Sequence, residues 1–208
     1  ILEERLNNAL KLFNGQPRIW IDPIISKNND ISINPDDNYD KRIEIKNIVN
    51  NPSSIIISAP PQFGLTCLSH FMILEAWNNS KLWIYIDSKK IKAHNVIQYV
   101  DNELNQLGLT KAIHIDCFIM DEWNPFENGS LKKLKALCDT YPNIPVILMR
   151  TIENAKFIKE KLEDIKIDRK FDTYFLLAMT RNQIRRVVKK KKKKVQIADD
   201  EALLEKLL

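Results

Sequence analysis

Residues Ser54–His70 read SIIISAPPQFGLTCLSH, and the order of residue types in this stretch decides the expected fold. A run rich in β-branched residues stops at Ala59, and a turn containing adjacent prolines follows it. An apolar pattern with helical spacing then begins after Gly64. The stretch therefore predicts a strand, a tight loop and a helix, in that order.

The predicted loop partly matches the phosphate-binding pattern GxxxxGK[ST], in which backbone N–H groups at a helix N-terminus surround phosphates. Gly64 and Thr66 fit the pattern, but Ala59 replaces the first glycine and Leu65 replaces the lysine. The prolines bring no N–H donors. Losing the lysine harms hydrolysis more than binding, so we expect weak or absent hydrolysis, and a lysine restored at position 65 should tighten binding. The expected nucleotide-contacting positions are Ala59, Gln62, Phe63, Gly64, Leu65, Thr66 and Cys67. The alternative is a strand, turn and helix without a ligand.

The composition is that of a globular chain with one local concentration of charge. With 208 residues, 44% of them hydrophobic, the chain can form one α/β domain with a smaller appendage, or two small domains. The six lysines Lys189–Lys194 exceed the net charge of +5, so the remainder is close to neutral. Such a tract either contacts nucleic-acid phosphates or forms a solvated helix end. Arg181–Lys194 contains no aromatic residue for base stacking. Nucleic-acid association through this tract is the alternative function.

The sequence shows no sign of a membrane or secreted protein. No apolar run approaches the roughly 20 residues of a membrane span, and Ile1–Leu12 is charged rather than signal-like. The three cysteines, Cys67, Cys117 and Cys138, lack metal-ligand spacing and favour free thiols in a reducing compartment. We expect a cytoplasmic protein. Since the chain starts without Met, we also expect a fragment of a longer one.

Three regions are predicted along the chain. Residues 1–50 form a helix that ends near Gly15 and a turn-rich linker containing Pro17, Pro23 and Pro35. Residues 51–190 alternate apolar runs with helical patterns, which predicts a three-layer α/β core with a five-stranded parallel sheet. Residues 191–208 form a basic linker and a C-terminal helix that starts a further module.

The strands are expected at residues 55–58, 82–86, 112–115 (with a possible extension to 120), 146–149 and 174–177. Helices are expected at residues 65–78, 96–107, 131–140 and 154–163, and from residue 181 onward.

Acidic residues near the third predicted strand are the candidates for a Mg²⁺ ligand and a water-orienting base. Asp116 ends the apolar run 112–115 and is favoured. Asp121 and Glu122 end the longer run, with a surface turn as their alternative role. Arg150 ends the fourth strand, where it is either a sensor of the terminal phosphate or an ordinary surface residue.

The order of these features resembles the STAND-type P-loop ATPases, which are related to AAA+ and NACHT modules. The resemblance covers roughly residues 43–190. It rests on the loop Ala59–Thr66, the acid at Asp116, the strand end LMRT, and the segment YFLLAMTRNQIRRVV at Tyr174–Val188. The last segment is the most specific of these.

The resemblance implies a regulatory switch that binds ATP or ADP with Mg²⁺, held through Thr66 and Asp116. It implies self-association that couples a C-terminal sensor domain to an N-terminal effector, often in bacterial defence against phage. Asp116, Asp121, Glu122 and Arg150 would be the catalytic or sensing residues. The departure at Leu65 puts hydrolysis in doubt, and an active ATPase that takes its cation from elsewhere is the remaining alternative.

Overall fold

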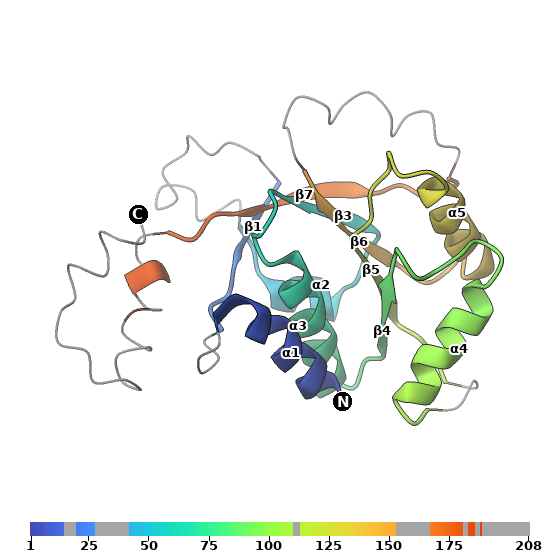
Figure 1. Ribbon diagram of the computed structural model, residues 1–208, viewed down its shortest axis with the longest axis horizontal. Helices are drawn as coiled ribbons and strands as arrows, with labels where there is room; N and C mark the ends of the chain where they lie inside the picture. The colour runs from blue at the N-terminus through green and yellow to red at the C-terminus, as the bar shows by residue number, and fades with distance from the viewer. Residues whose placement is uncertain are drawn as a thin grey trace.

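A seven-stranded sheet forms the centre of the computed structural model, which describes residues 1–14, 20–27, 42–109, 113–152, 167–180, 183–185 and 188 (Figure 1). The strand order is β2-β1-β7-β3-β6-β5-β4. The strands are β1 (Ile24–Ser26), β2 (Arg42–Ile43), β3 (Ile55–Ala59), β4 (Trp83–Asp87), β5 (Cys117–Asp121), β6 (Val146–Thr151) and β7 (Asp172–Leu177). The helices are α1 (Leu2–Asn14), α2 (Ile45–Asn50), α3 (Leu65–Asn78), α4 (Val96–Gln106) and α5 (Ser130–Thr140).

Five core strands run parallel to one another, in the order β7-β3-β6-β5-β4. They form because helices cover both faces of the sheet, so that almost every residue of β3 and β5 is buried. The complete sheet is nevertheless mixed rather than five-stranded and parallel, because two short strands extend it beyond β7.

Those two strands come from the segment that the sequence assigns to a linker. β1 pairs antiparallel with β7, placing Ile25 opposite Leu176, and β2 pairs antiparallel with β1. Ile25 is fully buried, so its side chain gains from covering the sheet. Pro23 stands directly before β1, where a missing N–H does not interrupt the ladder. The segment is therefore part of the core sheet.

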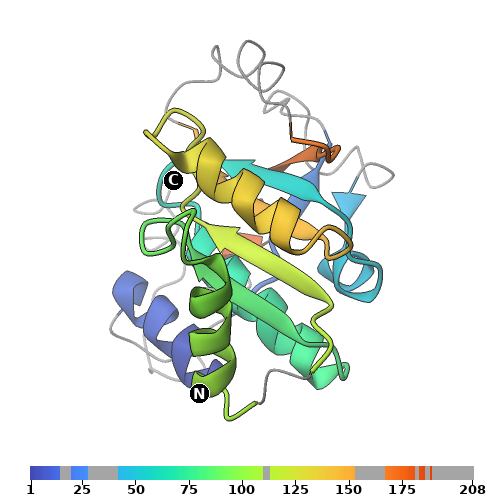
Figure 2. The same ribbon diagram turned by 90° about the vertical axis from the view of Figure 1, so that its right-hand side faces the viewer.

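Two helical layers enclose the sheet, which confirms the three-layer architecture. α3 covers one face with α1 and α2, while α4 and α5 lie across the other, nearer the viewer in Figure 2. Side chains alternate along each strand: Ile57 packs toward α3, and Ile56 packs toward α4 and α5. A salt bridge of 2.7 Å from Arg5 to Glu103 joins α1 to α4 beside the β4 edge.

The helices expected at 65–78, 96–107 and 131–140 correspond to α3, α4 and α5. The helix expected at 154–163 and the module at 191–208 lie outside the described residues. Of the basic helix expected from Arg181, residues 183–185 are described and are helical. None of the described helices is long and apolar enough to span a membrane.

The start of the third core strand differs from the expectation. The strand begins at Cys117, and the described residues before it, 113–116, are not part of the sheet. The apolar residue Ile115 is buried there without strand pairing, so the apolar alternation reflects burial rather than a ladder.

Candidate functional site

The loop after β3 has the backbone of a strand-to-helix turn that opens toward solvent. Gly64 precedes α3 with φ of 86°, a left-handed conformation that glycine adopts without strain, and its carbonyl accepts the N–H of Leu68 at 2.9 Å. Gln62 also has positive φ, at 68°. Residues 60–63 are exposed. The N-terminus of α3 is thus accessible at the carboxyl edge of the sheet, where an anion can approach it.

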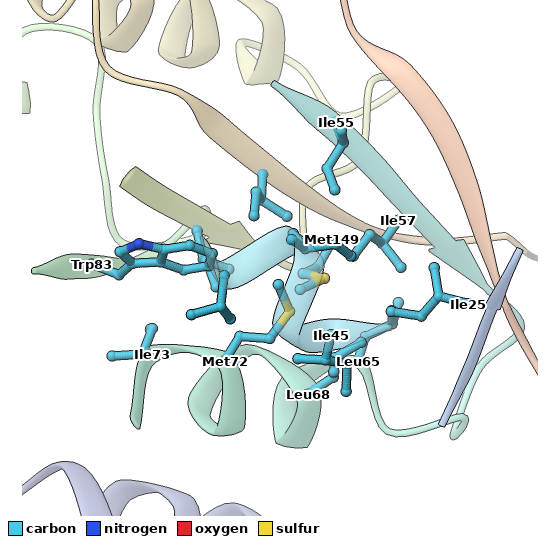
Figure 3. Packing of buried hydrophobic residues seen from close by; sticks show 14 of the residues in the cluster. Ile25, Ile45, Ile55, Ile57, Leu65, Leu68, Met72, Ile73, Trp83 and Met149 are labelled. Carbon is cyan, nitrogen blue, oxygen red and sulfur yellow. The ribbon is translucent and has the colours of Figure 1, made fainter. Parts of the chain in front are cut away.

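Leu65, which replaces the lysine of the phosphate-binding pattern, faces the core rather than the loop. Its side chain is 8% exposed and belongs to a cluster with Ile25, Ile45 and Leu68 (Figure 3). The first turn of α3 is therefore anchored by apolar contact with the linker strand and α2. No cation projects from this position.

Asp121 lies at the carboxyl end of β5 and is the acid that the structure places beside the loop helix. It is 1% exposed. The phenol of Tyr85, on neighbouring β4, donates to Asp121 Oδ2 at 2.9 Å, and the hydroxyl of Thr66 hydrogen-bonds the same carboxylate. Burial raises the pKa of the Asp121 carboxyl, although these hydrogen bonds oppose the rise.

His70, one turn further along α3, holds the Tyr85 ring in place. The two rings stack with centroids 4.5 Å apart and an interplanar angle of 23°. Burial, with a smaller contribution from nearby Arg5, lowers the pKa of His70 to about 4, so the imidazole is neutral at neutral pH. Burial and the adjacent Asp121 raise the pKa of Tyr85, which keeps the phenol protonated as a hydrogen-bond donor.

Glu122 follows Asp121 in a left-handed conformation, with φ of 54°. Its carboxylate forms a 2.6 Å salt bridge with Lys89, and its carbonyl accepts the hydroxyl of Ser88 at 2.7 Å. Lys133 on α5 donates to the carbonyl of Ser88 at 2.8 Å. These contacts join the ends of β4 and β5 at the loop edge. Within them, the side chains of Glu122 and Lys89 are paired with each other.

Asp116 does not lie with the other predicted site residues. It precedes β5, so it is at the amino edge of the sheet, opposite the loop that follows parallel β3. Its Oδ2 accepts the N–H of Leu82 at 2.8 Å, and its own N–H donates to the Leu82 carbonyl. The expected metal pair of Thr66 and Asp116 is therefore not brought together, and Asp116 anchors the start of the strand.

Arg150 lies near the carboxyl end of β6, opposite Ser58 of β3. The strand alternation places both side chains on the α4–α5 face, whereas Asp121 faces α3. Arg150 is 6% exposed, and burial lowers its pKa. Its Nε and the hydroxyl of Ser58 have no hydrogen-bond partner among the described residues.

Two further loop positions differ in accessibility. Phe63 is 40% exposed at the mouth of the loop. Cys67 is buried in α3, where burial and then the charge of Asp121 raise the pKa of its thiol, so the thiol stays protonated and unreactive.

The sequence analysis does not identify Tyr85, because a tyrosine inside an apolar strand carries no signal of what its hydroxyl contacts.

Mg²⁺ prefers oxygen ligands and retains several waters when it binds to a protein. A hydroxyl and a carboxylate are present in Thr66 and Asp121. The carboxylate, however, is almost inaccessible and already accepts hydrogen bonds from Thr66 and Tyr85. These residues do not fit an Mg²⁺ ion in the present arrangement. Within the described ranges, no group of three or more acidic, histidine or cysteine side chains could hold a metal.

No family model matches the sequence, and no curated protein matches it. Among solved structures, the chain is similar to a DNA replication initiation factor with a TM-score of 0.50 and 12% identity, over 77% of this chain and 52% of that chain. It also aligns with AMPPCP-bound DnaA from Aquifex aeolicus, with a TM-score of 0.48 and 15% identity over 79% of this chain and 54% of that chain. The chain spans about half the length of these proteins.

The likeness shows the fold: an α/β domain with a mixed seven-stranded sheet, similar to AAA+ ATPase domains. The strand β3, the loop after it and the helix α3 follow one another at the carboxyl edge of this sheet.

Proposed function

We propose that this chain is a regulatory nucleotide-binding core of the STAND type, which binds ATP or ADP at the loop Ala59–Thr66 and turns it over slowly or not at all. The observation that carries the proposal is the exposed loop with left-handed Gly64 at the N-terminus of α3, beside the buried acid Asp121. The absence of a lysine at the loop, where Leu65 packs into the core, favours binding without rapid hydrolysis.

Within this proposal, Asp121 replaces Asp116 as the acid of the site, and Arg150 is a sensor only if its side chain turns from the α4–α5 face toward the nucleotide. Nucleotide binding would change self-association and activate an effector domain elsewhere in a longer cytoplasmic chain, with bacterial defence against phage as the setting. The docking of the linker strand on Leu65 supports a path from the loop to the N-terminal side.

Isothermal titration with a non-hydrolysable ATP analogue tests the binding. We expect measurable heat at up to about 1 mM ligand. Phe63→Asp adds a negative charge at the mouth of the loop and should weaken binding at least about tenfold by repelling the phosphates. Ile97→Asp makes the same kind of change at a residue 60% exposed on α4, and it should leave affinity unchanged.

No heat for the wild-type chain, or equal weakening by both variants, would overturn the proposed site. Sedimentation velocity with and without nucleotide tests self-association: an unchanged sedimentation coefficient would remove the switching part of the proposal while leaving the binding part intact.

A further inference from the structure

We propose that this site binds its nucleotide without a divalent metal ion, because the hydroxyl of Tyr85 occupies the position at Asp121 that a metal would need. The inference rests on the proposed nucleotide binding and adds what the site recognises: the metal-free phosphate chain.

Asp121 Oδ2 accepts the Tyr85 phenol at 2.9 Å, and the Thr66 hydroxyl is bonded to the same group. With 1% exposure, the carboxylate has no face open to the waters that Mg²⁺ carries. A metal would have to displace the phenol or draw Asp121 out of the core.

Tyr85 is positioned by its backbone pairing in the sheet and by a ring contact with α3. Its ring stacks on His70 of α3 at 4.5 Å, and β4 is paired with β5 so that Tyr85 lies opposite Ile119. The hydroxyl therefore approaches Asp121 from a ring that is stacked against α3, and moving it away would break that stacking. A partly buried phenol that lost this acceptor would lose a hydrogen bond to a charged group.

The other acids at this edge of the sheet are also paired. Glu122 is paired with Lys89 at 2.6 Å, and Asp87 is paired with Lys90 at 3.1 Å. Each acid at the carboxyl ends of β4 and β5 thus already has a cation or a hydrogen-bond donor. Among the described residues of this edge, the acids do not gather into a group of three or more that could hold a metal.

The test is a pair of titrations of the wild-type protein with ADP, one in Mg²⁺ and one in EDTA, repeated with Tyr85→Phe. We expect wild-type affinities that agree within about twofold. Removing the phenol frees Asp121, so Tyr85→Phe should bind ADP at least about fivefold more tightly in Mg²⁺ than in EDTA. Tyr99→Phe is the matched control: its hydroxyl accepts the Asp87 N–H at 3.0 Å, away from Asp121, and it should behave as wild type.

Wild-type binding that requires Mg²⁺ would overturn this inference and leave the proposed function standing. Binding in neither buffer would overturn the proposed function and the inference with it. Should Tyr85→Phe fold and remain independent of Mg²⁺, the assignment to Tyr85 would be wrong. If that variant fails to fold, the wild-type comparison alone decides, since it needs no substitution.

Discussion

Ser58 and Arg150 stand opposite each other on adjacent parallel strands, and each keeps a buried polar atom without a partner in the described part of the chain. A buried guanidinium nitrogen that lacks a hydrogen-bond partner destabilises the folded state, because the loss of its contacts with water is not offset. Such an arrangement is retained where the polar group contacts a ligand or another molecule.

Arg150→Met should therefore raise the free energy of unfolding by about 1 kcal/mol while reducing the stabilisation that nucleotide provides. Chemical denaturation with and without ligand measures both quantities. Arg169→Met is the matched control, because Arg169 donates to the carbonyls of Tyr141, Pro142 and Ile144. It should lower stability by about 1–3 kcal/mol. Destabilisation by both variants would show that Arg150 has structural partners.

Leu65→Lys should lower the free energy of unfolding by about 3 kcal/mol and should not tighten nucleotide binding, contrary to the expectation from the sequence. The side chain is buried against Ile25 and Ile45, so the lysine loses apolar contact and brings a charge into the core. Urea denaturation measures the change. Ile97→Lys, at an exposed position, should stay within about 0.5 kcal/mol of wild type. A stable Leu65→Lys variant with tighter binding would show that position 65 can still reach the phosphates.

Acidification should destabilise the protein through His70. Its pKa falls from 6.5 when unfolded to about 4 when folded, so the unfolded chain binds the extra proton as the pH drops from 6.5 toward 4. The loss of stability between pH 7 and pH 4.5 should reach about 2 kcal/mol from this group. His70→Gln should reduce the pH dependence in that window, whereas His94→Gln, at an exposed position, should not. Parallel pH profiles for wild type and His70→Gln would contradict the assignment.

Gln183→Met should loosen the contact between the linker and the start of the C-terminal helix. The Gln183 amide accepts the Thr180 N–H at 2.8 Å, its Nε2 donates to the Asp22 carbonyl at 2.8 Å, and the Thr180 hydroxyl caps Gln183 in return at 3.1 Å. We expect a loss of about 1 kcal/mol and faster hydrogen exchange at the β1 amides. Gln98→Met, on the exposed side of α4, should change neither, and unchanged β1 exchange in Gln183→Met would refute the coupling.

The core could be predicted from sequence wherever a local pattern has one structural meaning. The strand expected at 55–58 and the helix expected at 65–78 are confirmed by β3 and α3. A strand buried on both faces needs continuous apolar residues, and Gly64 marks the turn between the two elements. These are properties of neighbouring residues.

The rest depends on residues that are distant in the sequence. Asp116 and Asp121 both end apolar runs, and only the register of β5 with β4 and β6 shows which one reaches the loop edge. The pairing of Tyr85 with Asp121 needs the same register, and the pairing of β1 with β7 joins segments about 150 residues apart. Local composition carries no information on these contacts.

The position of β1 and β2 also bears on how the core could be isolated. A fragment that begins at Asn51 would lack both strands and would leave the hydrogen-bonding edge of β7 uncovered. An uncovered edge is a template on which a second chain can add, so such a fragment would tend to aggregate. β1 and β2 thus cover the β7 edge and leave only a two-residue strand, β2, at that end of the sheet.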